Sequence, residues 1–209
     1  MKVIAINGSP HTRGNTAFAI GEVGKSLQEE NIDFEIIHVG HKPIRGCMAC
    51  NKCFENKDGK CIFGGDMVNE VLPKLKEADG IIISSPVYYS GIAGTMKSFL
   101  DRVFYVASAN GGWFRHKVGS AVVALRRSGG SMTFDSLNHY LNISEMLIPS
   151  SNYWNIIHGH QPGEARQDME GVQIMQQLGK NMAWMLKMKY NTKEMEPPRV
   201  EKVRMNFIR

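Results

Sequence analysis

The first sixteen residues limit what this chain can fold into. Residues 3–6 form an apolar, mostly β-branched run, which is typical of a parallel strand buried on both faces. A polar, glycine-containing loop follows, and Asn15 and Thr16 then open a helical pattern as cap residues. Unpaired N–H groups and the helix dipole favour an anion there. The loop is neither a Gly-Lys-Ser/Thr P-loop nor a GxGxxG turn. It predicts a phosphate-binding turn, and the alternative is an ordinary polar loop.

Strand-like and helix-like patterns alternate along all 209 residues, which predicts an α/β, doubly wound sheet with helices on both faces. The expected strands cover 2–7, 33–39, 80–85, 118–125 and 152–157, and the expected helices cover 15–30, 66–78 (capped by Asp66), 94–106, 131–146 and 166–190. Five strands in this alternation fit a flavodoxin-like, five-stranded parallel sheet of order 2-1-3-4-5. Such sheets bind ligands beyond the carboxyl ends of strands one and three. We expect one domain over residues 1–190 and an extended C-terminal arm over 191–209.

The net charge of +5 does not indicate a nucleic-acid partner, because basic residues are scattered among acidic ones. No apolar run reaches the ~18–20 residues that a membrane span needs, so we expect no membrane association. A strand begins at the second residue and leaves no room for a signal peptide. We therefore expect a cytoplasmic protein.

A second loop, from Ser84 to Lys97, leaves the expected sheet at the same edge as the phosphate loop. Tyr88 and Tyr89, followed by small residues, make a flat amphipathic shelf, and exposed backbone beside it can hydrogen-bond the edge of a heterocycle. A phosphate loop next to an aromatic shelf suits a mononucleotide with a large planar ring, and FMN is that ligand. The alternative is that both tyrosines are packing residues.

The residues of these two loops carry a resemblance to a known family. The pattern Gly8-Ser9-Pro10-(x)4-Asn15-Thr16, combined with Ser85-Pro86-Val87-Tyr88-Tyr89-(x)4-Gly94-Thr95-Met96-Lys97-(x)3-Asp101-Arg102, resembles the NADPH-dependent FMN reductase family. That family includes the iron–sulfur flavoproteins of anaerobes. The resemblance covers residues 1–130, and no motif aligns over the remainder of the chain.

The resemblance implies particular FMN contacts. The residues that fall where the family holds the phosphate are Ser9, Arg13, Asn15 and Thr16. Those that fall where it holds the isoalloxazine ring are Pro86, Val87, Tyr88, Tyr89, Ser90 and Gly91, with a third loop at Ser128, Gly129 and Gly130. Arg126 and Arg127, ahead of the third loop, depart from the usual pattern. The resemblance also implies a homodimer or homotetramer, with the arm of residues 191–209 packed on a neighbouring subunit.

All four cysteines lie in one loop, at positions 47, 50, 53 and 61. Three cysteines at three-residue spacing with a fourth nearby can wrap a [4Fe–4S] cluster, and the pattern also resembles the compact motif of iron–sulfur flavoproteins. The alternative is free thiols that pack beside the flavin. Structural zinc usually shows two CxxC pairs with a longer gap, and a disulfide is disfavoured in a cytosolic chain. Because the loop follows the strand next to strand one, we expect Cys47, Cys50, Cys53 and Cys61 near the flavin edge.

These features favour an enzyme that passes electrons from NAD(P)H through FMN to a small acceptor such as a quinone, a nitro- or azo-aromatic or free flavin. We expect no catalytic side chain, because the cofactor carries the chemistry. Backbone amides near Tyr89–Gly91 and Gly129–Gly130 would stabilise the reduced ring. One alternative is an electron carrier that ferredoxin feeds through the cluster. Another is a non-catalytic interaction protein. His11, in the phosphate loop, is a secondary candidate for a ligand contact or for solvent exposure; His158 and His160 are candidates for a metal pair, although no third ligand is evident, or for a loop role.

Overall fold

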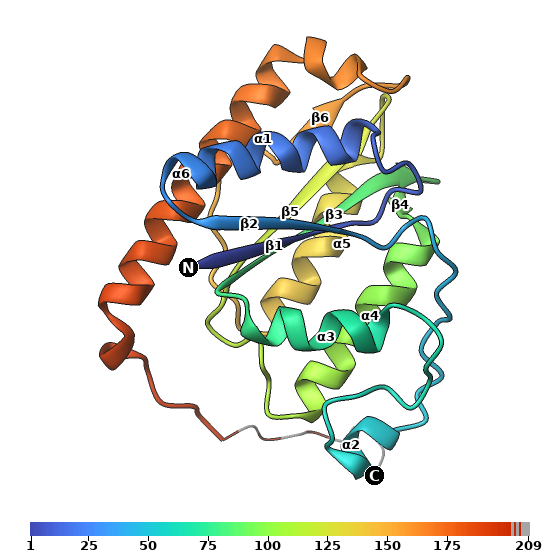
Figure 1. Ribbon diagram of the computed structural model, residues 1–209, viewed down its shortest axis with the longest axis vertical. Coiled ribbons are helices and arrows are strands. Elements are labelled where there is room, and N and C mark those ends of the chain that lie inside the picture. The colour runs from blue at the N-terminus through green and yellow to red at the C-terminus, as the bar shows by residue number, and fades with distance from the viewer. Residues whose placement is uncertain (202, 204, 206–209) are drawn as a thin grey trace.

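A parallel sheet forms the centre of the computed structural model, which describes residues 1–201, 203 and 205 (Figure 1). Its strands, in spatial order, are β2 (Asp33–His38), β1 (Lys2–Asn7), β3 (Gly80–Tyr88), β5 (Val118–Leu125) and β6 (Ile156–His158). A short strand, β4 (Gly91–Ile92), pairs antiparallel with the end of β3. The five parallel strands lie in the order expected from the sequence, so the flavodoxin-like fold is confirmed.

Helices cover both faces of the sheet. On one face lie α1 (Asn15–Glu29) and α6 (Met169–Asn191), and on the other lie α3 (Val68–Glu77), α4 (Gly94–Ala109) and α5 (Gly130–Ile143). The short helix α2 (Lys52–Asn56) belongs to the cysteine-containing loop. Side chains of β1 alternate between the two cores: Val3 and Ala5 pack with α1 and α6, whereas Ile4 and Ile6 pack with the other layer. A strand buried on both faces needs such a continuous apolar run.

The last expected strand is placed wrongly by the sequence. Strand β6 covers Ile156–His158, while Tyr153 and Trp154 lie in a loop with 59% and 54% of their surface exposed. Pairing with β5 begins only after the buried Asn155, whose side-chain amide donates to the Ala121 carbonyl at 3.0 Å. The aromatic residues suit a strand by propensity, but this tertiary hydrogen bond decides where the strand begins.

One helix cap and two helix starts differ from expectation. Gly14, rather than Asn15 or Thr16, is the cap of α1, and Met67 rather than Asp66 precedes α3. The Asp66 carboxylate still accepts from the Val68 N–H at 3.1 Å. Helix α6 begins at Met169, after a 3-10 turn at Glu164–Gln167.

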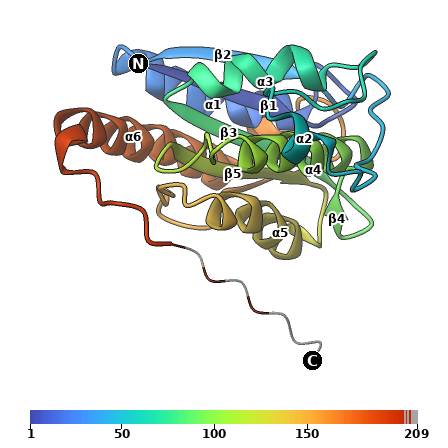
Figure 2. The ribbon, with the colours of Figure 1, turned by 90° about the horizontal axis from the view of Figure 1, so that it is seen from below.

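The chain leaves the layered body after α6 (Figure 2). A 3-10 turn, Lys193–Met195, follows, and the Arg115 guanidinium then donates to the Pro197 carbonyl at 3.0 Å. The start of the predicted arm therefore contacts its own chain, and packing on a neighbouring subunit stays a prediction. Residues 202, 204 and 206–209 of that arm lie outside the described residues.

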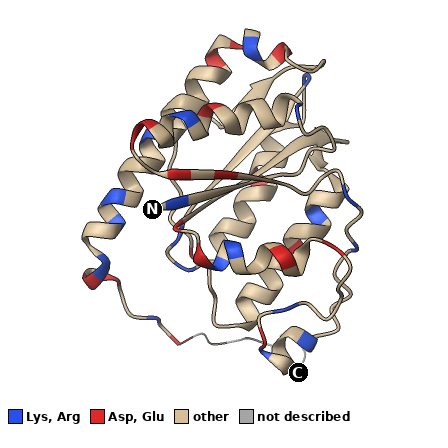
Figure 3. Cartoon of the chain, in the orientation of Figure 1, with Lys and Arg blue, Asp and Glu red and all other residues tan. Residues whose placement is uncertain are grey.

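Basic and acidic side chains are interspersed along the helices and strands in Figure 3. Within the part of the chain that the structure describes, every helix is too short or too polar to cross a bilayer.

Candidate functional site

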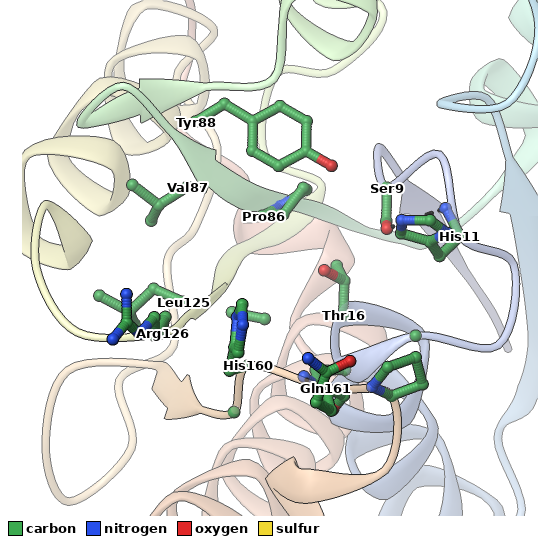
Figure 4. Close-up of a pocket in the computed structure, with 15 residues that line it drawn as sticks. Ser9, His11, Thr16, Pro86, Val87, Tyr88, Leu125, Arg126, His160 and Gln161 are labelled. Atoms are coloured by element: carbon green, nitrogen blue, oxygen red, sulfur yellow. Dashed lines mark hydrogen bonds between the residues drawn. The ribbon is translucent and has the colours of Figure 1, made fainter.

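A cavity of about 420 Å³ opens at the carboxyl ends of the parallel strands (Figure 4). It lies beyond the ends of the neighbouring strands β1 and β3, whose following helices α1 and α4 cover opposite faces of the sheet, and this is the position expected for a ligand in this fold. The lining comes from the β1–α1 loop, the ends of β3 and β5, and the loop after β6: Ser9, His11, Gly14, Asn15, Thr16, Pro86, Val87, Tyr88, Ala124, Leu125, Arg126, Gly159, His160, Gln161 and Pro162.

The β1–α1 loop is held tightly against β3. Gly8 donates its N–H to the Ser84 carbonyl at 2.9 Å, and a Cβ at Gly8 would lie only 2.8 Å from that oxygen. The buried Asn7 accepts from the Ser9 N–H at 2.9 Å, and Ser9 Oγ in turn accepts from the His11 N–H at 3.1 Å. These bonds fix the Ser9 hydroxyl at the floor of the cavity, with its own proton free to donate.

The cavity favours an anion. The α1 helix points its N-terminus into it, with no side-chain cap and no acidic residue in its first turn. Among the described lining residues are Arg126, His11 and His160 but no Asp or Glu. Arg126 and His11 lie on opposite sides of the opening in Figure 4. Open amide ends, the buried hydroxyls of Ser9 and Thr16 and this balance of charge are what a phosphate group requires.

Asn15 joins the phosphate loop to the loop after β6. Its side-chain Nδ2 donates to the Gln161 carbonyl at 3.0 Å, and its Oδ1 accepts from the N–H groups of Gly163 and Ala165 at 3.2 and 3.3 Å. The side chain expected at the phosphate is thus largely engaged by protein partners. Asn15 positions a wall of the cavity and keeps one side-chain N–H for a ligand.

Only part of the loop expected to hold the isoalloxazine ring faces the cavity. Pro86, Val87 and Tyr88 line the cavity, whereas Tyr89 is fully exposed. Tyr89 and Ser90 have φ values of 48° and 58°, the left-handed geometry that closes a two-residue hairpin between β3 and β4. That turn carries the Tyr89 ring outward.

The third expected loop packs on this hairpin. A Cβ at Gly129, whose φ is 84°, would lie 2.8 Å from Ser90 Cα, so only glycine permits the contact. The predicted residues that stay off the cavity lining are Arg13, Tyr89, Ser90, Gly91, Ser128, Gly129 and Gly130.

Apart from His160, which was a secondary candidate, sequence reasoning missed two parts of the cavity. Arg126 precedes the expected third loop and lines the wall itself, and residues 159–162 follow β6 at the same sheet edge. The signal was present for both, since each segment directly follows an expected strand and the carboxyl ends of parallel strands meet at one edge.

A larger cavity, of about 600 Å³, lies at the opposite end of the molecule, beside the last turns of α6. Apolar side chains such as Leu147, Met185 and Met188 line it, and the carboxylate residue Glu196 also belongs to its lining. It therefore does not suit a phosphate.

The cysteine loop begins beside the phosphate loop and then runs along α4. Gly40 donates to the Asn7 carbonyl at 3.3 Å, but Asn51 reaches the Tyr105 hydroxyl at 2.6 Å, far along α4. Figure 1 shows α2 beside the later half of α4, away from β4. Asn51 and α2 therefore lie along α4 rather than at the sheet edge, and the location of all four cysteines near the flavin edge stays a prediction.

The four thiols differ in exposure. Cys47 and Cys50 are exposed, Cys53 is buried and Cys61 is half-buried. Burial raises the pKa of the Cys53 thiol. No three His, Cys, Asp or Glu side chains within the described ranges converge as metal ligands. Four thiols are the kind and number of ligands that a [4Fe–4S] cluster takes. For all four to bind one cluster, the exposed Cys47 and Cys50 have to move toward Cys53 and Cys61.

Comparisons with known proteins agree with this geometry. Residues 1–161 match the sequence profile of the family described as NADPH-dependent FMN reductase. An iron-sulfur flavoprotein of Methanocaldococcus jannaschii is 36% identical over 195 residues, covering 90% of this chain and 98% of the relative. An iron-sulfur flavoprotein of Archaeoglobus fulgidus is 30% identical over 197 residues, covering 88% and 96%.

Among solved structures, RosB with a bound 8-demethyl-8-formylriboflavin-5'-phosphate intermediate superposes with a TM-score of 0.71 at 15% identity, covering 100% of this chain and 92% of RosB. This likeness concerns the fold alone. The sequence matches carry the assignment further: the chain belongs to the NADPH-dependent FMN reductase family of flavin-binding oxidoreductases.

Proposed function

We propose that this protein is an FMN-containing electron carrier that also holds a [4Fe–4S] cluster on Cys47, Cys50, Cys53 and Cys61. The observation that carries the proposal is the four-cysteine loop itself, present in a chain whose cavity suits a phosphate. The relatives named iron-sulfur flavoproteins, which align over most of the chain, support it. Ferredoxin is the proposed electron donor, and a small molecule the proposed acceptor.

Different residues of the cavity would contact the phosphate and the ring of FMN. Ser9, Thr16 and the first amides of α1 would hold the phosphate, and Val87 and Tyr88 would contact the ring, since all four side chains line the cavity. When bound, FMN exchanges one or two electrons and the cluster exchanges one, so together they can connect a one-electron donor to a two-electron acceptor. The unpaired charge of Arg126, which has no ion-pair partner among the described residues, adds positive potential at the cavity wall.

Anaerobic purification tests the proposal. The visible spectrum, combined with iron and sulfide analysis, should report one flavin and about four irons per chain, as a [4Fe–4S] cluster requires. Reduced ferredoxin should then reduce the protein faster than NADPH does. Anaerobically reconstituted protein without stoichiometric iron would refute the cluster.

The second candidate is the plain NAD(P)H:FMN reductase expected first from the sequence. The match of residues 1–161 to a family described as NADPH-dependent favours it. In that case NADPH should reduce the flavin at the faster rate, and replacing all four cysteines with alanine should leave that rate unchanged. A homo-oligomer is proposed for either candidate, and sedimentation would measure it.

A further inference from the structure

Arg102 is the most deeply buried charged residue next to the cysteine loop, with 1% of its surface exposed. It lies on α4, eight positions beyond Gly94 and thus about 12 Å along the helix axis from the cavity end. Its guanidinium does not face the cavity. It points instead into the base of the loop that carries the four cysteines.

Both ends of the cysteine segment bind this one side chain. Before the first cysteine, the Arg45 carbonyl accepts from Nη1 at 3.2 Å. After the last, the Phe63 carbonyl accepts from Nη2 at 2.7 Å, and Asp66 forms an ion pair with Nη1. The sulfur of Cys61 itself accepts from Nε at 3.3 Å. A planar guanidinium with five N–H donors can satisfy such a divergent set, whereas a lysine ammonium cannot reach it all.

Cys61 is also held from the side of α3. The Asn69 carboxamide accepts from the Cys61 N–H at 2.8 Å and donates to the Cys61 carbonyl at 2.8 Å. Backbone and sulfur of Cys61 are thus fixed by two helices. Cys47 and Cys50, by contrast, are exposed on backbone without regular structure. Cys61 is therefore anchored by contacts from two helices, whereas Cys47 and Cys50 are exposed to solvent.

We propose that Arg102 is a positioning residue that clasps the cysteine loop and fixes Cys61 as the anchored thiol, around which the other cysteines close on a cluster. The cluster part of this inference rests on the proposed function, and the clasp does not. An N–H donated by a cation to a ligating sulfur withdraws electron density, so Arg102 also makes the reduction potential of the cluster more positive.

The clasp is tested on iron-free, FMN-loaded protein by timing iodoacetamide alkylation of each cysteine with mass spectrometry. Iodoacetamide reacts with the thiolate, so the rates are measured over a series of pH values and expressed per thiolate. In Arg102→Gln the per-thiolate rate of Cys61 should be at least about tenfold higher, the effect of losing one hydrogen bond to a charged group, while Cys47 and Cys50 keep their rates. Lys52→Gln removes a charge from the same loop, but from an exposed pair with Glu55, and should leave the Cys61 rate unchanged. FMN affinity serves as the folding control.

An unchanged Cys61 rate in folded Arg102→Gln protein would overturn the clasp, as would equal acceleration of all four cysteines. If Arg102→Gln does not fold, the same measurement is made on Arg102→Lys, which keeps the charge. The alkylation rate of Cys61 should again rise selectively, because one ammonium group cannot replace the planar set of guanidinium N–H donors.

Reconstituted protein tests the cluster part. Arg102→Gln should hold less iron and show a more negative cluster potential than wild type, and Arg102→Lys should restore part of the potential. Equal iron and equal potential in all three proteins would refute this part. Wild-type protein without iron would refute the proposed function, and the alkylation rates would still decide the clasp.

Discussion

Replacing Ser9 and Thr16 together with alanine tests the phosphate site most directly. Both residues are buried, at 4% and 2% exposure, and both line the cavity at the N-terminus of α1. Ser9 Oγ already accepts from the His11 N–H, so its own proton is available to a phosphate oxygen. Lost charge-assisted hydrogen bonds of this kind should weaken FMN binding by about 1–3 kcal/mol in total, which is roughly one to two orders of magnitude in Kd.

The assay is a fluorescence titration of apoprotein with FMN and, separately, with riboflavin, which lacks the phosphate. The double variant should lose affinity for FMN and keep most of its affinity for riboflavin, because the hydroxyls act on the phosphate. Ser136→Ala, at a half-buried position on α5 away from the cavity lining, is the matched control. An unchanged FMN affinity, or an equal loss for both ligands, would show that these hydroxyls do not hold a phosphate.

Three further predictions concern the ring, the loop and the cysteines. Tyr88→Ala should weaken FMN binding and shift the flavin spectrum, whereas Tyr89→Ala should do neither, since only Tyr88 lines the cavity; the reverse order would place the ring elsewhere. Gly8→Ala should lower stability by about 1–3 kcal/mol in urea unfolding, because its Cβ would lie 2.8 Å from the Ser84 carbonyl; an unchanged midpoint would refute the close packing. Cys50→Ala should abolish the broad absorption near ~400 nm of anaerobic protein and leave FMN bound; retained absorption would remove Cys50 from the ligand set.

The sequence predicts the sheet order and the carboxyl-end site well, because local patterns identify the strands and general topology rules then order them. Apolar β-branched runs define the strands, and the parallel connection rule then places the two loops at one edge. It misplaces β6, because the aromatic residues before Ile156 have strand propensity but no partner strand at that position. Propensity is local, and strand pairing is not.

The sequence also showed which residue types occur at the site, but it did not show which of their side chains point into the cavity. Tyr88 and Tyr89 are equivalent in composition, and only the left-handed turn at Tyr89 and Ser90 separates a cavity-lining ring from an exposed one. Asn15 suits a phosphate by type, yet contacts more than a hundred residues away in sequence engage most of its side chain.

In the cysteine loop, too, the sequence determines the residue types and the tertiary structure determines their placement. The spacing of its four thiols, and hence the chemistry open to them, is a property of the sequence alone. The course of the loop along α4, and the anchoring of Cys61 by Arg102 and Asn69, depend on the tertiary structure. A hydrogen bond between residues 41 positions apart is set by how α4 packs, and no local pattern encodes that packing. Local sequence determined the elements and the donor atoms, and long-range packing decided which donors point at the same place.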